Sequence, residues 1–495
     1  MKKGWRVIAS VLTLVLAAGL LLTGCNKGGT TSGETKEILW CVVGDEKKDS
    51  AMVTEKMNEI LEEKLNLRIK FKYLTTDNYD LVLQSGEAYD IICAPDWLGY
   101  WDNIDRGAFA EITDEDLQTN APYIWENGQK YLFAAKADGK LYGIPGMREY
   151  APDRCYAARG DLMDKYGIPD LNTVDNVEKY LLAVADNEEN IIPFDMPGTT
   201  PYFMLNMWAS DWGWAAVGTL SFGEHVYFRL DDPERKLFIA VDQPESREFS
   251  LKMKEWMDRG VFSKSVLSNK VSSTDSFKNG RSALCWLSDP NECNRVWQEF
   301  QQDDRKNWDV RFYPVYSKTQ RMYNYLNSVA SISNFSNNKA DALKVLNEFY
   351  ANEELYNLLG KGIKGTHWDV DSEGYYQILD NDSYSGVTTG VNNMAYDIPT
   401  KLVFPGADEL VAKLESFRVA DPIINCNVNM PELKEIKVSL DEVYWNYTAP
   451  RCYGAVDDVD QAIADEREAL KNAGIDQYVE VLQKRLDEFA ATLDE

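Results

Sequence analysis

Histidine is nearly absent from this chain, whose 495 residues include only His225 and His367. A hydrolytic triad needs an imidazole beside its nucleophile, and zinc sites commonly use histidine ligands, so neither kind of site is favoured. The sequence also lacks a Walker-type phosphate loop, a dinucleotide-binding glycine pattern and a G-x-S-x-G nucleophile turn. We therefore expect a protein with no cofactor, no metal and no catalytic residues.

Positive charge is scarce as well. Lys and Arg number 52 against 80 Asp and Glu, which gives a formal net charge of −28. Such a charge repels nucleic acid and anionic lipid surfaces, so we expect no nucleic-acid partner and no direct membrane surface contact. Aromatic residues are plentiful, with 14 Trp and 27 Tyr, and a number of that size leaves some rings for a binding surface after the core is filled.

Paired cysteine motifs are missing too, since none of the eight cysteines forms a C-x-x-C pair. Without Cys25 seven remain, and an odd number leaves at least one thiol unpaired within the chain. Most of the seven lie in apolar runs, where a free thiol behaves as a small hydrophobic group. We expect most of them to be free.

The leader of the chain has basic residues followed by the apolar run 7–22. The run is short for a membrane span, which needs about 20 residues, but it suits a signal peptide. Leu22-Thr23-Gly24-Cys25 resembles a bacterial lipobox, which implies cleavage before Cys25 and lipidation of its thiol; the alternative is a signal peptide with a chance cysteine. We expect a signal peptide at 1–24, a flexible polar tether at 25–36 and a body held outside the plasma membrane by a lipid.

The first part of the body alternates strands and helices. Strands are predicted over 38–43, 69–73 and 90–94, and helices near 50–65 and 79–85 separate them. This order predicts a parallel sheet, and ligands of such sheets bind outside the carboxyl ends of the strands. Asp45, Asp96 and Trp97 follow two of these ends and are therefore candidate ligand-binding residues.

Six segments resemble, in family order, the family 1 extracellular solute-binding proteins of ABC importers. They are KADGKLYGIPG at 136–146, GDLMDKYGI at 160–168, FKNGRSA at 277–283, NKADALKVL at 338–346, GIKGTHW at 362–368 and LKNAGID at 470–476. The last one is similar to a subgroup whose C-terminal domain has no assigned function. Each match is weak alone, but together they cover nearly the whole mature chain behind a lipobox.

The resemblance implies an α/β, periplasmic-binding-protein-like fold with two lobes joined by hinge crossings. We expect the first lobe at 36–146 and 328–365, and the second lobe at 147–327 and 366–495, including a C-terminal helical region. The implied function is that of an extracellular, lipid-anchored monomer that captures a small molecule by lobe closure and delivers it to ABC permease subunits. An oligosaccharide is the favoured ligand. The alternatives are a peptide-binding relative and an extracellular glycosidase, because so acidic a chain offers many carboxylate pairs.

Ten residues are candidates for ligand binding on these grounds: Asp45, Asp96, Trp97, Arg148, Tyr150, Trp208, Trp212, Trp286, Asp289 and Trp368. Flat aromatic faces suit the C–H patches of sugars, and carboxylates or guanidinium groups suit sugar hydroxyls. Structural roles are open for the same side chains: a helix cap and a core ring for Asp96 and Trp97, an ion pair between lobes for Arg148, core packing for at least one of the pair Trp208 and Trp212, a helix cap for Asp289 and a packed hairpin for Trp368. The string from Asp369 to Asp380 partly fits a calcium loop but lacks the usual final glutamate, so we do not expect calcium there.

Overall fold

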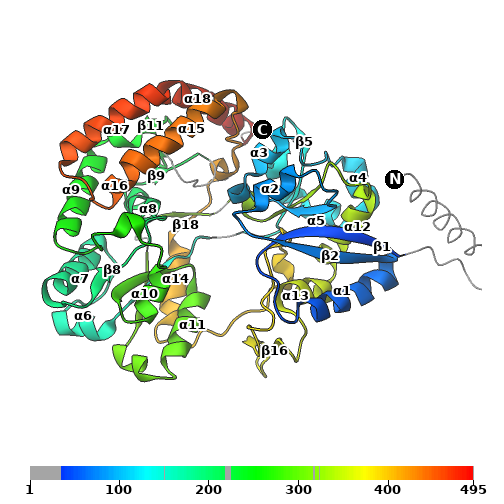
Figure 1. Cartoon of the computed structure of the whole chain (residues 1–495), viewed down its shortest axis with the longest axis horizontal. Coiled ribbons are helices and arrows are strands. Elements are labelled where there is room, and N and C mark those ends of the chain that lie inside the picture. Colours follow the sequence, from blue (N-terminus) through cyan, green and yellow to red (C-terminus); the bar gives the residue numbers. More distant parts are fainter. Residues whose placement is uncertain (1–34, 150, 218–224, 316–317, 323, 494–495) are drawn as a thin grey trace, which may run out of the picture. The chain divides into compact units, whose positions relative to one another are not determined.

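A computed structural model describes residues 35–149, 151–217, 225–315, 318–322 and 324–493 (Figure 1). The expected signal peptide, Cys25 and nearly all of the tether therefore lie outside the described residues. Backbone contacts group Glu37–Glu495 into one compact unit. Within the described part of the chain, no helix has both the length and the apolar character needed to cross a membrane.

The first lobe is built on a five-stranded sheet with the order β2-β1-β3-β15-β6. Its strands are β1 (Lys36–Val43), β2 (Leu67–Leu74), β3 (Ile91–Cys93), β6 (Ile144–Pro145) and β15 (Val329–Ile332). The apolar run of β1 is buried on both faces, with Trp40, Cys41 and Val42 fully inaccessible to solvent. The pairing of β1 with β3 is parallel, as the strand–helix–strand order predicts.

Helices cover this sheet and form a single hydrophobic cluster with it. They are α1 (Ser50–Leu65), α2 (Tyr79–Gln84), α3 (Tyr100–Asp105), α4 (Asp114–Asn120), α5 (Pro122–Leu132), α12 (Lys339–Ala351) and α13 (Glu353–Lys361). The predicted helix after β1 is confirmed, and it buries Val53, Met57 and Leu61 at helical spacing. A hairpin follows α5: β4 (Lys136–Ala137) pairs with β5 (Lys140–Leu141), and Asp138 and Gly139 have the positive φ that such a turn requires.

The second lobe is built on a four-stranded sheet with the order β13-β7-β12-β8. Its strands are β7 (Cys155–Ala158), β8 (Ile192–Phe194), β12 (Ser282–Leu287) and β13 (Arg311–Pro314). The helices packed in this lobe are α6 (Gly160–Tyr166), α7 (Val174–Asn187), α8 (Tyr202–Asp211), α9 (Pro244–Asp258), α10 (Ser273–Lys278), α11 (Pro290–Phe300) and α14 (Ala407–Phe417). Helix α9 begins at a proline and buries Phe249, Met253 and Trp256 on one face.

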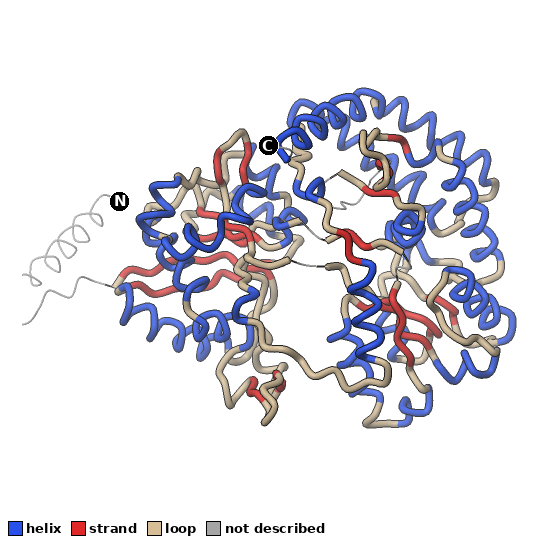
Figure 2. Tube along the Cα trace, turned by 180° about the vertical axis from the view of Figure 1, so that it is seen from behind, coloured by secondary structure: helices blue, strands red, loops and turns tan. Residues whose placement is uncertain are grey.

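A small ribbon and a group of C-terminal helices complete the chain. The ribbon has the order β11-β10-β9, from β9 (Trp214–Ala215), β10 (Val226–Arg229) and β11 (Phe238–Ile239). Figure 2 shows that the chain is almost entirely helical toward its C-terminus. These helices are α15 (Lys434–Val443), a π-helical turn η10 (Tyr444–Thr448), α16 (Ala449–Cys452), α17 (Val459–Ala473) and α18 (Ile475–Leu493).

The segment after α13 packs on the first lobe. It includes the hairpin of β16 (Trp368–Val370) and β17 (Tyr376–Ile378). Tyr384 and Val391 belong to the first lobe's hydrophobic cluster, and Thr388 forms a β-bridge with Val43. We therefore propose that the first lobe continues beyond the expected boundary at 365, to about residue 393, before the chain passes to the second lobe.

The cysteines of the body are free thiols, as expected. The seven are Cys41, Cys93, Cys155, Cys285, Cys293, Cys426 and Cys452, and all are buried. Burial raises the pKa of the Cys41, Cys426 and Cys452 thiols to about 12. These thiols stay protonated at neutral pH, which is consistent with a role in packing.

Candidate functional site

The carboxyl ends of the first lobe's strands meet the chain segments that pass between the lobes. β1 and β3 run in parallel, and β15 runs opposite to β3, with Ala330 beside Cys93. Val329, the first residue of β15, pairs with Pro145, the last residue of β6. The chain therefore leaves and re-enters this lobe at the edge where ligands of parallel sheets bind.

The second lobe repeats this arrangement. β7 begins at Cys155, which lies opposite the last residues of two neighbouring strands, Leu287 of β12 and Pro314 of β13. We call residues 147–154 the first crossing and residues 315–328 the second crossing. Both crossings therefore join the second lobe at its own carboxyl edge.

Asp96 and Trp97 lie on the 3₁₀ turn η1 (Asp96–Leu98), directly after β3. Asn324 of the second crossing donates a 2.9 Å hydrogen bond to Asp96 Oδ2, and Trp97 Nε1 donates a 3.2 Å bond to the carbonyl of Asn327. The Trp97 side chain is nevertheless 48% exposed, so its ring has an open face. Asp45, the third candidate of this edge, is exposed beside a hollow lined by Gly44, Lys47 and residues 385–388.

Arg148 is held by ion pairing in the first crossing. Its Nε donates a 2.6 Å hydrogen bond to Asn392 Oδ1, and its guanidinium contacts the Asp397 carboxylate. The pairing partner is thus a carboxylate from the segment that leads from the first lobe to the second. Tyr150, the other candidate of this crossing, lies outside the described residues.

The two candidate tryptophans of α8 differ in environment. Trp208 is 8% exposed and packs edge-on against Phe249 and Trp256, with ring centroids 5.3 and 5.6 Å away. Trp212 is half-buried, and its ring centroid lies 4.8 Å from that of Trp214. Trp208 therefore takes the core-packing role that was open for one of this pair.

Trp286 lies near the carboxyl end of β12. Its ring stacks on Phe203 with the centroids 5.2 Å apart, and the Arg154 guanidinium lies 5.5 Å above it. The Trp286 indole N–H is buried and has no hydrogen-bond partner among the described residues. Asp289 instead caps α11, because its Oδ1 accepts a 2.9 Å hydrogen bond from the Glu292 amide.

Trp368 belongs to a packed hairpin. It is 5% exposed, and its Nε1 donates a 2.9 Å hydrogen bond to the carbonyl of Gly362. In the same hairpin Asp371 Oδ1 accepts hydrogen bonds from the amides of Glu373 and Tyr375, each 2.9 Å long. Among the described residues, no group of three or more His, Cys, Asp or Glu side chains is arranged to hold a metal ion.

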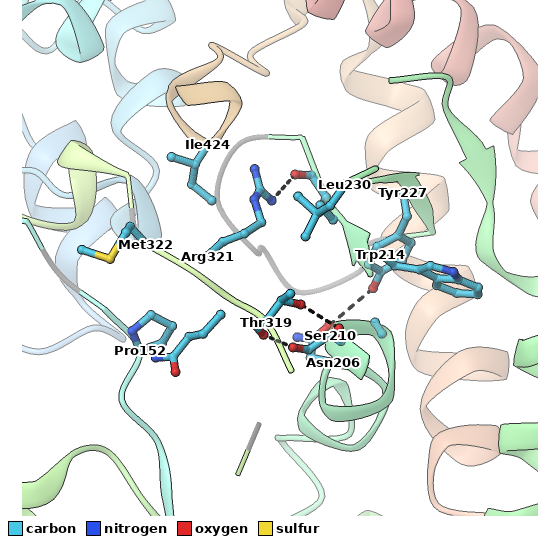
Figure 3. Close-up of a pocket in the computed structure, with 14 residues that line it drawn as sticks. Pro152, Asn206, Ser210, Trp214, Tyr227, Leu230, Thr319, Arg321, Met322 and Ile424 are labelled. Atoms are coloured by element: carbon cyan, nitrogen blue, oxygen red, sulfur yellow. Dashed lines mark hydrogen bonds between the residues drawn. The ribbon is translucent and has the colours of Figure 1, made fainter. Parts of the chain in front are cut away.

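A pocket lies in the second lobe where the two crossings arrive (Figure 3). Its walls come from the first crossing, the carboxyl half of α8, the ribbon strands β9 and β10, the second crossing and the 3₁₀ turn η8 (Pro422–Asn425). The described lining residues are Pro152, Asn206, Ala209, Ser210, Trp214, Ala215, Ala216, Tyr227, Leu230, Thr319, Gln320, Arg321, Met322 and Ile424.

The polar groups of this pocket are amides, hydroxyls and one guanidinium, with no carboxylate among the described lining residues. Tyr227 OH donates a 3.4 Å hydrogen bond to Asn206 Oδ1, and Thr319 Oγ1 donates a 2.8 Å bond to the carbonyl of Ser210 (Figure 3). Gln320 is 2% exposed, and its side-chain carbonyl oxygen has no hydrogen-bond partner among the described residues. The pocket wall therefore contains a buried acceptor that no described donor satisfies.

Arg321 is the charged residue of the pocket. Its Nη1 donates a 2.5 Å hydrogen bond to the carbonyl of Ala216, and its Nη2 lies 2.8 Å from Asp421 Oδ2. The exposed fractions of the Arg321 and Asp421 side chains are 10% and 9%. The guanidinium is thus held in a fixed position by a largely desolvated ion pair.

A two-stranded ribbon links the second crossing to the chain after α14. β14 (Gln320–Arg321) pairs in parallel with β18 (Arg418–Val419). Asp153 of the first crossing accepts a 3.2 Å hydrogen bond from Gln320 Nε2 and pairs with Arg418 Nη2 at 2.5 Å. These contacts fasten both crossings to the second lobe beside the pocket.

The sequence-based candidates include none of the described lining residues of this pocket. Of the ten, however, Trp212 contacts Trp214, and Trp286 contacts Arg154 two residues after Pro152. The sequence contains a signal that would have made Arg321 a candidate: it is an arginine of the second crossing, as Arg148 is an arginine of the first crossing. No comparable sequence signal marks Tyr227, because its position depends on the pairing of the very short strands β9, β10 and β11.

Comparisons with known proteins agree with this architecture along the whole chain. A carbohydrate ABC transporter substrate-binding protein of Streptococcus pneumoniae serotype 4 is 24% identical to the chain and matches 98% of it and 99% of its own length. The crystal structure of the N-glycan transport solute binding protein (NgtS) of S. pneumoniae superposes with a TM-score of 0.70 at 19% identity, covering 92% of this chain and 99% of that one. A second structure of that protein, in complex with Man1GlcNAc, has a TM-score of 0.66.

A family profile described as a domain of unknown function (DUF3502) matches residues 432–491, which hold α15 to α18. The expected resemblance to extracellular solute-binding proteins is therefore confirmed, together with the expected subgroup. The predicted α/β fold of the periplasmic-binding-protein type is confirmed as well.

Proposed function

We propose that this protein is the solute-binding component of an ABC importer and that it captures an oligosaccharide without changing it chemically. The observation that carries the proposal is the match of nearly the whole chain to a carbohydrate substrate-binding protein, combined with a pocket of aromatic, amide and hydroxyl groups at the crossings. Sugars bury C–H patches on aromatic rings and satisfy their hydroxyls with amides and guanidinium groups.

The mechanism is lobe closure. The open edges carry Asp96 and Trp97 on the first lobe and Trp286 on the second, and the pocket beside Arg321 receives part of the ligand. Rotation about the crossings brings the edges together and excludes water from the ligand, and the closed form is the one that permease subunits recognise. A ligand favours closure only to the extent that it binds the closed form more tightly.

We also propose that the protein does not cleave or otherwise alter its ligand. Asp96 is the single carboxylate among the described residues placed at the ligand, since the described pocket lining holds none, whereas glycosidases use a pair of carboxylates across the scissile bond. This composition supports binding over hydrolysis. The peptide-binding alternative has no comparable support from the relatives named above, which are named for carbohydrate and N-glycan transport.

The experiment is a thermal-shift screen of the soluble body, residues 35–495, with the saccharides named for its structural relatives: Man1GlcNAc, Man5GlcNAc, kestose and fructo-nystose. A ligand at 100 times its Kd stabilises the folded state by about 2.7 kcal/mol, which raises the unfolding temperature. We expect at least one saccharide to do so and to be recovered intact by chromatography. Stabilisation only by a peptide pool, or recovery of shorter sugars, overturns the proposal.

We propose further that Cys25 carries a lipid that keeps the protein at the outer face of the plasma membrane. A polar tether leaves the body free to reach its permease at raised effective concentration. Replacing Cys25 with serine is expected to move the protein from the membrane fraction to the culture medium. Replacing Cys93, a buried thiol of the body, with serine is the control and leaves the protein in the membrane fraction. Retention of the Cys25→Ser protein in the membrane contradicts the anchor.

The open ring of Trp97 is expected to stack on the ligand. Trp97→Ala should weaken saccharide binding about tenfold, roughly 1.4 kcal/mol, because an aromatic contact is lost. The matched control is Phe335→Ala. The Phe335 ring is 49% exposed, but it lies after the C-terminal end of β15, whereas Trp97 contacts Asn327 before the N-terminal end of that strand. Titration calorimetry measures both, and equal effects of the two substitutions would sink the assignment of Trp97.

A further inference from the structure

The helical segment matched by DUF3502 packs behind part of the pocket wall without lining the pocket. No described lining residue belongs to 432–491. The helices of this segment nevertheless pack against elements that form the pocket wall: α16 lies against α8, and α18 lies against η8. Ala215 of β9 and the nearby Val217 belong to the same cluster of buried apolar residues as the helices α15, α17 and α18.

Strand β10 shows how the segment reaches the pocket. Side chains alternate between the two faces of a strand. Val226 and Phe228 are buried in the cluster that contains Leu440 and Val443 of α15. Tyr227, which lies between them, belongs to the opposite face, packs on Trp214 and reaches Asn206 in the pocket (Figure 3). One face of β10 is therefore fixed by the C-terminal helices, and the other face presents a pocket side chain.

Specific hydrogen bonds fasten the segment to the pocket wall. His225, next to β10, has its Nε2 3.1 Å from the carbonyl of Leu440. Gln483 Oε1 of α18 accepts a 2.8 Å hydrogen bond from the amide of Leu237, which precedes β11. Tyr453 OH donates a 2.7 Å bond to the carbonyl of Pro197, in the loop between β8 and α8. These bonds fix the ribbon and the approach to α8 in register with the helices.

Residues 432–491 also pack tightly against α9. Arg451 of α16 and Glu466 of α17 form a two-pronged ion pair, and both residues are 1% exposed. Arg451 Nη1 also donates a 2.9 Å hydrogen bond to Ser250 Oγ of α9. The backbone of Gly454 packs directly against α9. A Cβ added at Gly454 would lie 2.0 Å from the carbonyl oxygen of Met253 in that helix. A buried polar pair and a close backbone approach leave this interface little freedom to slide.

We propose that residues 432–491 are a positioning element that sets the width and shape of the saccharide pocket, and thereby its selectivity, without touching the ligand. This inference rests on the proposed saccharide-binding function of the pocket. The chemistry of recognition belongs to Tyr227, Asn206 and Arg321, while the C-terminal helices hold the wall that carries them. Changes inside these helices then alter which saccharide is preferred.

The test compares two buried leucines. Leu440→Ala removes a side chain from the cluster behind β10, and Leu61→Ala removes one from α1 of the first lobe. Both are measured at a temperature where both variants are fully folded, with the two saccharides of the panel that bind the wild type most tightly. We expect Leu440→Ala to weaken binding at least tenfold and to change the ratio of the two affinities at least threefold. Leu61→Ala should leave both quantities within twofold, and equal effects of the two variants overturn the inference.

A milder pair covers the case in which Leu440→Ala does not fold. Tyr453→Phe deletes the hydroxyl bound to Pro197, and Tyr180→Phe deletes a buried hydroxyl of α7 that donates a 3.0 Å bond to the carbonyl of Ala283 at the far end of β12. Tyr453→Phe is expected to weaken binding about threefold or more, and Tyr180→Phe to leave it unchanged. A wild-type affinity for Tyr453→Phe counts against the inference.

A readout without ligand separates this inference from the proposed function. Hydrogen exchange of the β9 and β10 amides should accelerate at least tenfold in Tyr453→Phe or Leu440→Ala, and stay at the wild-type rate in Tyr180→Phe and Leu61→Ala. If the wild type binds no saccharide, the proposed function fails, and exchange alone then decides whether the helices hold the pocket wall. Unchanged exchange in β9 and β10 contradicts the positioning role in either case.

Discussion

Replacing Arg321 with alanine is expected to abolish saccharide binding and to lower the free energy of unfolding by about 3–5 kcal/mol, because it leaves the buried Asp421 carboxylate without its partner. Binding suffers for a second reason. The guanidinium is the charged donor of the pocket, and the position of its planar group is fixed by Ala216 and Asp421 before any ligand arrives. Urea unfolding measures the first effect, and titration calorimetry measures the second.

Two further variants separate these effects. Arg418→Ala changes β18, the strand that pairs with β14. The Arg418 side chain is 33% exposed, so we expect its replacement to lower the free energy of unfolding by only about 1 kcal/mol and to leave the affinity nearly unchanged. In the double variant Arg321→Gln with Asp421→Asn, the uncompensated charge is removed. Stability should largely return while binding stays lost. Recovery of binding in the double variant would show that the guanidinium does not contact the ligand.

The second large effect is expected at the buried ion pair of the C-terminal helices. Glu466→Leu leaves the Arg451 guanidinium buried and uncompensated and should cost about 3–5 kcal/mol of unfolding free energy at pH 7. Replacing both residues, Arg451→Met with Glu466→Leu, should restore stability to about the wild-type value, because the two desolvation costs disappear together. Urea titration of the single and double variants tests this. A double variant as unstable as the single one contradicts the account.

The pH dependence of this pair follows from the carboxyl group. Burial alone raises the pKa of Glu466, but the attraction of Arg451 outweighs it and holds the pKa below its usual range. A depressed pKa in the folded state contributes stability above the unfolded value, about 4.3, and this stability is lost as the pH falls through the folded value. The difference between wild type and Glu466→Leu should therefore shrink below pH 4. Arg247→Ala is the control, since its exposed pair with Asp460 joins α9 to the same helix α17, and its loss should leave the urea midpoint unchanged.

Much of the fold could be predicted because local patterns and tertiary packing agree. The apolar run of β1 has no polar face, so only a strand buried on both sides accommodates it. The apolar positions of α9 recur at helical spacing, and the proline at its first position suits the start of a helix. Asp138 and Gly139 specify their hairpin because few residues tolerate a positive φ.

The pocket could not be predicted in the same way. Trp208, Trp212 and Trp214 look like one aromatic cluster in the sequence, but α8 ends at Asp211 and Gly213 turns the chain with a φ of +71°. Trp214 consequently lies on a strand and faces the ribbon, whereas Trp208 faces the core. A glycine two residues after the last helical position is a known stop signal, and its use would have separated these rings.

Arg321 and Tyr227 illustrate the remaining limit. Their positions depend on β14 pairing with β18 and on β10 packing against the C-terminal helices, and these partners lie far apart in the sequence. Strands of two to four residues carry too little periodicity to predict such pairings. Asp289 and Trp368 were candidates because their residue types suit a sugar ligand. In the structure, the Asp289 side chain caps α11, and the Trp368 side chain donates its hydrogen bond within a packed hairpin.

The central claim is that this protein binds an oligosaccharide and releases it unchanged. The most direct measurement is calorimetric titration of residues 35–495 with the saccharide panel, followed by mass spectrometry of the recovered sugar. We expect one saccharide bound per protein molecule, with the mass of the recovered sugar unaltered. A recovered sugar of lower mass, or no binding heat with any saccharide, would contradict it.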